Sequence, residues 1–319
     1  GRGRGTVTLP EMRRAGARVC LATVIARSQP IDRTGPVAKR ETLDYIDPTA
    51  ASAACMGQLA WYELMAERGE VAVLRSADEL RSHWASDEDR IGVILLMEGA
   101  DPIVTPGQVG RWWDLGVRVV SLAHYGPSAY AMGTGGDGPL TEAGRRLITA
   151  MRRAGMILDL THTADASIAE AMDIFEGPVV STHANCRAIA DNDRQLTDEQ
   201  IRAIAARGGV MGVVPHVAMM RFPSGADPET HHVDRDGVTL EALVDHLDHI
   251  CQITGSADHA AIGSDLDGGF GTERIPRDMD RYGDLRRIAD VMAARGYTDG
   301  QIAAVFGGNW LRFFLNALP

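Results

Sequence analysis

The sequence is poor in aromatic residues, cysteines and long apolar runs, and each shortage excludes a class of protein. Aromatic residues make up 5% of the 319 residues, so we expect a core of Val, Ile, Leu and Ala. No apolar run approaches the roughly 20 residues that cross a bilayer. There is no N-x-S/T sequon and no C-x-x-C pair. The separated cysteines predict reduced thiols in a reducing compartment, and hence a cytoplasmic protein. They are Cys20, Cys55, Cys186 and Cys251.

Positive charge is also scarce. The chain has 32 Lys and Arg against 43 Asp and Glu, a net charge of −11. This balance argues against nucleic acid or an anionic membrane surface as the partner. No signal peptide is visible. However, the first residues, GRGRGTVTLPEMRRAG, lack an initiating Met and are typical of the inside of a loop. Whether an export signal lies upstream of Gly1 is therefore left open by the sequence.

Short apolar runs alternate with helical patterns along the whole chain. Runs of this kind are typical of parallel strands buried on both faces. They cover residues 17–25, 91–98, 117–124, 156–162, 178–183, 209–216 and 259–265. Helices are expected at 48–68, 141–155, 165–177, 196–209 and 239–255. With no linker between them, these elements predict one catalytic α/β domain over 1–319, with closing helices at about 298–318.

A (β/α)8 TIM-type barrel is the expected fold, although it needs eight strands and seven are visible. The rival is an open doubly wound sheet, but no G-x-G-x-x-G follows the first strand. The glycine-rich GTGGDG at 133–138 lies before a helix. Alone it is a weak phosphate-loop signal, and we interpret it as a flexible turn.

Most of the predicted strands end at a residue that can bind a metal or move a proton. A single histidine at a strand end is more often a hydrogen-bonded core or surface residue than a metal ligand. This structural interpretation is strongest for His216. In a barrel, however, the carboxyl ends of the strands converge on one mouth. The strand-end residues are Glu98, His124, His162, His183, His216 and Asp265.

Imidazoles and a carboxylate are suitable ligands for zinc or a similar divalent ion. A carboxylate buried beside imidazoles is costly without such a cation. Glu98 can bridge two ions, which would hold a hydroxide and polarise a carbonyl. Asp265 can then orient the water or shuttle its proton, and Asp159 can orient a ligand.

These residues lie in long ordered motifs that resemble the membrane (renal) dipeptidase family of zinc peptidases. The motifs include MEGADPI, LAHYGPSAYA, GMILDLTHTADASI, VVSTHANCRAIADNDRQLTDEQ, GSDLDGGF and GGNWLRFF. The resemblance runs from about Thr6 to the C-terminus. It implies a metallo-dependent hydrolase barrel with two zinc ions that cleaves dipeptides and often dimerises.

The resemblance also implies a role for each matching residue. Glu98 corresponds to the carboxylate that bridges the metals, and His162 and His183 to the imidazole ligands of the second zinc. His124 corresponds to the histidine that contacts the substrate and steadies the oxyanion. Arg194, rather than Arg187, matches the residue that binds the substrate carboxylate. Asp265 matches the acid–base carboxylate.

The chain departs from the family at its first strand. The family opens with a strand that ends in H-x-D and binds the first zinc, and no H-x-D precedes Glu98 here. We therefore expect the given chain to lack an N-terminal stretch and to bind at most one ion firmly.

Three alternatives stay open from the sequence. The barrel could carry another metal-dependent amidase or a lactonase, or it could be a non-catalytic barrel with a dismantled metal site. The loop at 216–237 is the longest candidate lid. His246 and His249 are spaced like a metal pair, but we expect them on a helix away from the site.

Overall fold

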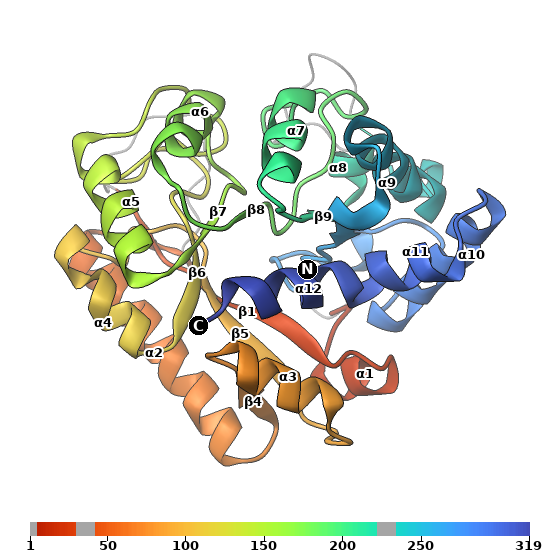
Figure 1. Cartoon of the computed structure of the whole chain (residues 1–319), viewed down its shortest axis with the longest axis horizontal. Coiled ribbons are helices and arrows are strands. Elements are labelled where there is room, and N and C mark those ends of the chain that lie inside the picture. Colours follow the sequence, from red (N-terminus) through yellow and green to blue (C-terminus); the bar gives the residue numbers. More distant parts are fainter. Residues whose placement is uncertain (1–4, 30–41, 222–233) are drawn as a thin grey trace. The chain divides into compact units, whose positions relative to one another are not determined.

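The computed structural model describes residues 5–29, 42–221 and 234–319 (Figure 1). Most of the predicted lid, residues 222–233, lies outside the described residues. The chain divides into two compact units, Arg18–Val179 with Leu315–Pro319, and Gly1–Ala17 with Val180–Phe314. The single domain expected from the sequence stays a prediction. In the described residues, no helix combines the length and the apolar character that crossing a membrane requires.

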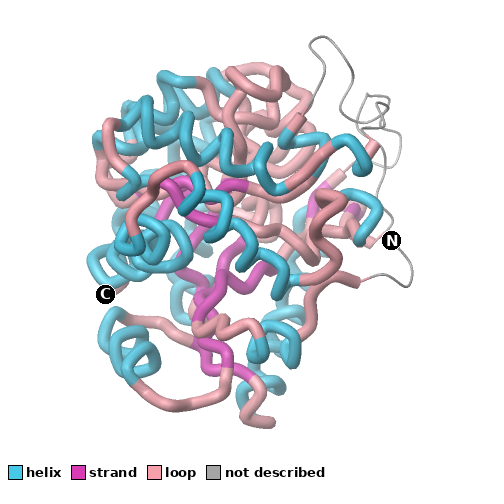
Figure 2. The backbone as a smooth tube through the Cα atoms, turned by 90° about the vertical axis from the view of Figure 1, so that its right-hand side faces the viewer, coloured by secondary structure: helices cyan, strands magenta, loops and turns pink. Residues whose placement is uncertain are grey.

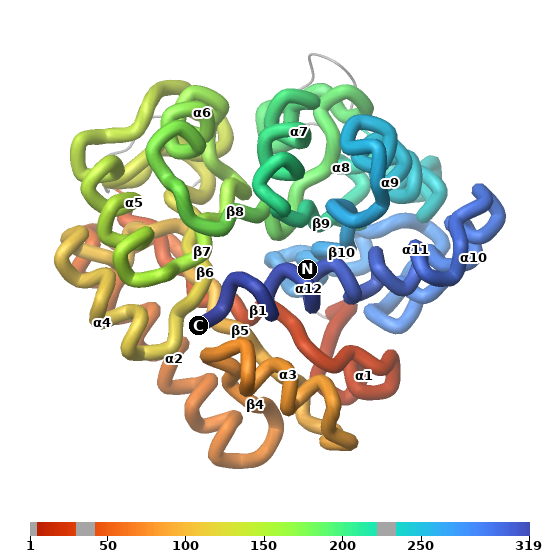
Figure 3. The backbone as a smooth tube through the Cα atoms, in the orientation of Figure 1, coloured from red at the N-terminus to blue at the C-terminus, as the bar shows by residue number. Residues whose placement is uncertain are grey.

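The unit that begins at Arg18 is built on a parallel sheet. Its strands follow the order β1, β5, β6, β7 and β8, and β4 pairs with β5. β1, β5 and β6 lie side by side in Figures 1 and 3. The strands are β1 Val19–Val24, β4 Val71–Val73, β5 Ile91–Met97, β6 Val117–Ser121, β7 Ile157–Asp159 and β8 Val179–Val180. A shorter pair joins β2 Arg27–Ser28 to β3 Asp44–Tyr45.

The register of this sheet places the carboxyl ends of three strands in line. Met97 of β5 pairs with Val120 of β6, and Ser121 of β6 pairs with Asp159 of β7. Every residue of β5 and β6 is buried, as expected for strands covered on both faces. The residues that follow these strands therefore emerge at one edge of the sheet.

Helices connect the strands of this unit. Figure 2 colours all helices of the chain cyan and all strands magenta. Helix α5 illustrates why they form where they do. The Thr141 side chain accepts a hydrogen bond from Gly144 N at its start, and Gly155 ends it with φ of 80°. The helices are α2 Pro48–Glu67, α3 Ala77–Ala85, η1 Pro106–Gln108, α4 Val109–Asp114, α5 Glu142–Ala154 and α6 Asp165–Ile174.

The other unit contains the parallel pair β9 Met211–Val213 and β10 Ala260–Ile262. Ser181, just after β8, forms an isolated parallel bridge with Met211. The α-helices of this second unit are α1 Leu9–Arg14, α7 Asp198–Ala206, α8 Val217–Met220, α9 Leu240–Thr254, α10 Arg287–Ala294 and α11 Asp299–Ala303. Helix α12 Asn309–Ala317 ends the chain. Short helical turns are η2 Arg235–Gly237, η3 Ala257–His259, η4 Thr272–Arg274, η5 Tyr282–Arg286 and η6 Ala304–Gly308.

The seven predicted strands are all present, in shorter form, as β1 and β5 to β10. The predicted α/β class with parallel strands is thereby confirmed. The capping box at Thr197 and Gln200 is also confirmed at the start of α7. The sequence analysis missed β4 because its three residues are too few to show a pattern.

His246 and His249 on α9 do not form a metal pair. His246 is fully buried; its Nδ1 accepts a hydrogen bond from Cys186 N at 3.1 Å, and its Nε2 lies 3.0 Å from Met220 O. His249 Nε2 instead lies 2.7 Å from a carboxylate oxygen of Asp198. Both imidazoles thus have structural partners, and both lie on a helix, as the sequence predicted. Burial lowers the pKa of His246 to about 4.

This buried imidazole predicts a loss of stability in mild acid. The pKa of His246 is lower in the folded chain than the usual 6.5, so the unfolded chain binds more protons between pH 6.5 and pH 4. Its contribution to the free energy of unfolding should therefore fall by about 3 kcal/mol as the pH drops through this window. Urea titrations at several pH values measure this. His246→Asn should be less stable at pH 7 but show a shallower pH dependence; an unchanged slope would contradict the assignment.

Candidate metal centre

Three buried donor groups converge after strands β5, β6 and β7. His162 Nε2 lies 3.3 Å and His124 Nε2 lies 3.6 Å from the same oxygen, Oε1 of Glu98. The three candidate ligand atoms all lie within 4.8 Å of one another. A tetrahedral zinc ion with bonds of about 2.1 Å spaces its ligands about 3.4 Å apart. The donor set and its spacing therefore fit a divalent ion.

Burial makes this grouping costly unless a cation compensates it. The exposed fractions of Glu98, His124 and His162 are 8%, 8% and 6%. A carboxylate removed from water loses solvation that neutral imidazoles do not fully replace. A bound cation would offset that cost, which supports the metal site predicted from the residue types.

The sheet places Glu98 through two hydrogen bonds that continue its ladder. Glu98 N donates to Val24 O of β1 at 3.0 Å. The next residue, Gly99, donates its N–H to Oγ of Ser121 at 2.8 Å. The carboxylate thus stands on backbone that is fixed from both neighbouring strands.

The two histidines are joined by a loop that returns from β6. Thr134 N donates to both His124 O at 3.0 Å and His162 O at 2.9 Å, and Thr134 Oγ1 lies 3.1 Å from His162 Nδ1. The adjacent position must be glycine, since a Cβ on Gly133 would lie 1.9 Å from His124 O. Tyr125 packs its ring edge-on against both imidazoles, with centroid distances of 5.0 and 4.9 Å. GTGGDG therefore holds the imidazoles, rather than forming the flexible turn predicted from its composition.

Backbone strain marks two of the predicted site residues. Among the described residues, His162 and Asp265 are the two non-glycine positions with left-handed φ, at 63° and 50°. Such conformations cost on the order of 1–3 kcal/mol and concentrate at functional sites. Gly268 leaves room for the Asp265 carboxylate, because a Cβ at this position would lie 2.3 Å from Oδ1 of Asp265 and would displace that side chain.

In the other unit, Arg194 has a nitrogen available for a ligand. Its Nη2 donates to His183 O at 2.7 Å, and the residue is 6% exposed. Its Nη1 is buried and has no hydrogen-bond partner within the described ranges. Arg187, in contrast, donates through Nε and Nη2 to Gln195 O. These contacts favour Arg194 over Arg187 as a ligand-binding residue, and the role of Arg194 stays a prediction.

His183 and His216 are the remaining strand-end histidines. His183 Nδ1 lies 2.9 Å from Oγ1 of the preceding Thr182. His216 packs edge-on against Phe270 at 4.9 Å, and its Nδ1 is buried without a hydrogen-bond partner among the residues described. Burial, together with the positive charges of Arg274 and Arg194, lowers the pKa of His216 to about 4. His216 is therefore a neutral imidazole at neutral pH, and its burial is compatible with the core residue that the sequence favoured.

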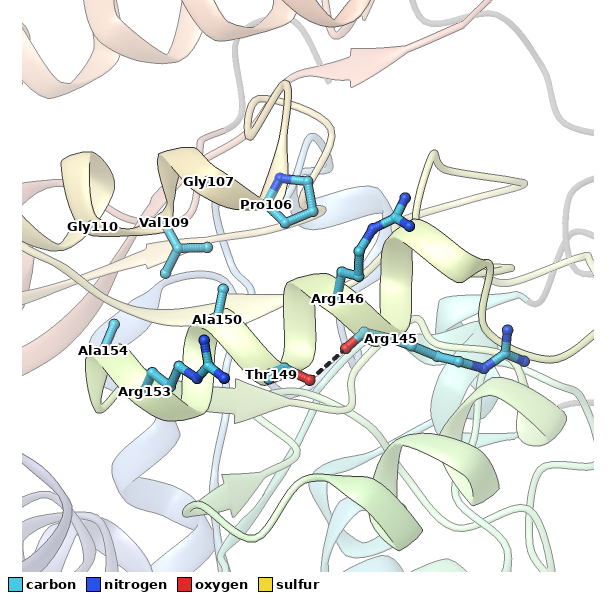
Figure 4. Close-up of a pocket in the computed structure, with 10 residues that line it drawn as sticks. All are labelled: Pro106, Gly107, Val109, Gly110, Arg145, Arg146, Thr149, Ala150, Arg153 and Ala154. Carbon is cyan, nitrogen blue, oxygen red and sulfur yellow. Dashed lines mark hydrogen bonds between the residues drawn. The ribbon is translucent and has the colours of Figure 1, made fainter.

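A separate cavity of about 630 Å³ lies between η1–α4 and α5 (Figure 4). Its walls carry Arg145, Arg146 and Arg153, and two of these pair with Glu170 and Glu142. Its lining contains no carboxylate, imidazole or thiol, and no residue of the Glu98–His124–His162 cluster. It therefore offers no catalytic group, and the donor cluster is the candidate site.

Comparison with known proteins identifies the family and agrees with the fold. The model of the family described as "Membrane dipeptidase (Peptidase family M19)" matches residues 2–317, and the chain belongs to this family. A crystal structure of an M19 metallo peptidase, dipeptidase AC, is 26% identical with a TM-score of 0.83. The match covers 100% of this chain and 91% of that chain. This match confirms the predicted fold class.

Two further relatives carry informative names. A metallo peptidase from Rhodobacter sphaeroides, solved with a phosphinate mimic of the dipeptide L-Ala-D-Ala, is 27% identical with a TM-score of 0.81. The match covers 100% of this chain and 92% of that one. Dipeptidase verJ of Clonostachys rogersoniana is 31% identical over 70% of this chain and 54% of its own length. The chain spans about half the length of most curated relatives it matches.

The structure thus brings together Glu98, His162 and His124 of the predicted site. It describes His183, Arg194 and Asp265 within the other unit, and their predicted roles stay predictions. Sequence reasoning missed the contributions of Thr134 and Tyr125. Two signals pointed to these residues. Tyr125 directly follows the predicted site histidine His124, and the GTGGDG segment that contains Thr134 lies between His124 and His162 in the sequence.

The cluster predicts different effects for two of its members. Glu98→Gln should remove tight metal binding, because an amide lacks the charge that offsets the cation. His124→Gln should retain the ion, because we expect His124 to contact substrate rather than metal. Elemental analysis after dialysis against metal-free buffer measures both. Loss of the ion from His124→Gln would make His124 a ligand.

Proposed function

We propose that this protein is a zinc-dependent dipeptidase. The observation that carries the proposal is the buried pair of Glu98 and His162, 3.3 Å apart and spaced as metal ligands are, with His124 beside the same carboxylate oxygen, in a chain of the M19 family. The dipeptide mimic bound by the Rhodobacter sphaeroides relative supports the substrate class. The imidazole and carboxylate donors favour zinc.

In this proposal Glu98, His162 and His183 hold the ion. When bound, the ion would act as a Lewis acid on the peptide carbonyl and lower the pKa of a bound water. His124 donates a hydrogen bond to the oxygen that becomes negative as the carbonyl is attacked. Asp265 takes a proton from the attacking water and delivers it to the leaving amine.

Arg194 binds the free carboxylate of the dipeptide. Its guanidinium is buried and anchored through Nη2 to His183 O, which leaves Nη1 for a ligand. A buried donor without a partner costs about 1–3 kcal/mol, and a substrate oxygen would satisfy it. A neutral lactone or an internal amide has no charged group for this arginine, so Arg194 favours dipeptides over those substrates.

We propose a cytoplasmic homodimer. Burial raises the pKa of Cys55 to about 12, which keeps this thiol protonated and inert. Cys186 is also fully buried, with a raised pKa. Structural thiols of this kind are typical of a reducing compartment. Fractionation of the native cells and sedimentation of the purified protein test these two statements.

A substrate panel tests the proposed activity directly. Metal-supplied protein should hydrolyse free dipeptides, including ones with a D-residue at the second position. Glu98→Gln should be inactive on the whole panel. Turnover of lactones without turnover of any dipeptide would replace the dipeptidase by a lactonase on the same fold.

Substitution of Arg194 should weaken binding of the substrate more than it slows the chemical step. Arg194→Ala removes a charge-assisted pair, so kcat/KM should fall by about 2–4 kcal/mol, mostly through KM. Steady-state kinetics with a free dipeptide and its C-amidated form measure this. If the parent enzyme cleaves the amide as well as the acid, Arg194 does not bind the carboxylate.

Substitution of Asp265 should affect the chemical step alone. Asp265→Asn keeps the shape of the side chain but removes its basic oxygen. We expect kcat to fall by roughly 100-fold or more, with metal content unchanged. Kinetics and elemental analysis on one preparation measure both. A parallel loss of metal and activity would identify Asp265 as a ligand instead.

A further inference from the structure

The hydroxyl of Thr134 contacts the side of His162 that faces away from Glu98. Thr134 Oγ1 lies 3.1 Å from His162 Nδ1, while His162 Nε2 lies 3.3 Å from Glu98 Oε1. Thr134 and His162 are 4% and 6% exposed, so water does not readily replace this contact. A neutral imidazole carries its proton on one nitrogen only. When Oγ1 accepts a hydrogen bond from Nδ1–H, the proton stays on Nδ1 and the lone pair of Nε2 is directed toward the carboxylate.

The backbone of Thr134 fixes this hydroxyl in place. Its N–H is shared between His124 O and His162 O, and isolated bridges join Thr134 to Tyr125 and Gly133 to Thr163. The peptide therefore ties together the residues that follow β6 and β7. It also contacts the carbonyl of His162, whose left-handed backbone needs such support.

The other predicted imidazole ligand has the same arrangement. Thr182 Oγ1 lies 2.9 Å from His183 Nδ1. The two contacts arise differently, since Thr182 precedes its histidine and Thr134 comes from a loop 28 residues earlier in the chain. Metal-binding histidines commonly donate their second N–H to an oxygen, which fixes the tautomer and the ring orientation.

We propose that Thr134 is a positioning residue for the metal centre, which selects the Nδ1–H tautomer of His162 and so presents Nε2 to the ion. The proposal rests on the metal site proposed above. It assigns the GTGGDG segment a role in aligning a ligand rather than in binding phosphate. Thr134 acts through His162 and does not contact substrate.

The neighbouring Thr163 provides a matched control. It is also 4% exposed and follows His162 directly, but its Oγ1 has no hydrogen-bond partner within the described part of the chain. Thr→Val at either position keeps the shape of the side chain and removes the hydroxyl. The pair therefore separates the effect of the Thr134 contact from the effect of losing any buried hydroxyl beside His162.

The experiment measures zinc affinity by competition with a chelator, and thermal unfolding of the metal-free protein, for the parent and three variants. Thr134→Val should bind zinc about 10- to 100-fold more weakly. Thr134→Ser keeps the hydroxyl and should restore affinity to within about 3-fold of the parent, by the same reasoning. Thr163→Val should bind zinc as the parent does. Unfolding temperatures of the metal-free forms should fall by no more than a few degrees, because one buried hydrogen bond contributes only about 1 kcal/mol.

Several outcomes overturn the proposal. Parent-like zinc affinity in Thr134→Val shows that the hydroxyl does not position His162, and an equal loss in Thr134→Ser or Thr163→Val shows that packing is responsible. If Thr134→Val does not fold, Thr134→Ala compared with Thr134→Ser applies the same criterion. Failure of the metal site itself is distinct: the parent would then bind zinc no better than Glu98→Gln.

Discussion

The buried carboxylate of Glu98 is the constraint on which the candidate site depends. It lies at the carboxyl end of a fully buried strand, where the register of β5, β6 and β7 directs three chain segments to one edge. Two imidazoles approach one of its oxygens at 3.3 and 3.6 Å. Neutral imidazoles alone do not compensate a buried negative charge. A bound cation would offset this charge, so the burial that makes the carboxylate costly also makes this edge of the sheet a candidate metal site.

The surrounding loops hold the histidines in conformations that the chain would not adopt alone. His162 has a left-handed backbone, and its carbonyl is held by the N–H of Thr134. The same loop is fastened at its far end by Asp101, whose carboxylate accepts hydrogen bonds from Ala129 N and Ser28 N. Burial raises the pKa of Asp101 to about 6, which means that removing its carboxylate from water disfavours the ionised form. The loop thus depends on polar contacts, and packing of the sheet supplies the stability that offsets their cost.

The sequence predicted the strands well because buried parallel strands are nearly continuous apolar runs. It also predicted Glu98 and His162, since each stands at the end of such a run. It could not predict Thr134, because the contact with His162 spans 28 residues and depends on the fold of a loop without periodicity. Gly133 is explained by the close approach of His124 O, which only coordinates reveal. Strand β4 was missed because three residues show no periodic pattern. It is recognised as a strand only by its parallel pairing with β5 in the structure.

The charged groups around His216 indicate which charge a ligand of Arg194 should carry. Burial is the largest cause of the lowered pKa of His216. The positive charges of Arg274 and Arg194 lower this pKa further, and the negative charge of Glu273 opposes them. The imidazole therefore stays neutral and adds no positive charge to that of the guanidinium groups. Arg194 still has a buried nitrogen without a hydrogen-bond partner among the described residues. A ligand with one negative charge and an oxygen acceptor satisfies both the charge and the donor, whereas a neutral ligand satisfies the donor alone. The buried Nη1 of Arg194 therefore supports the proposal that the substrate carries a free carboxylate, on an observation separate from the family match.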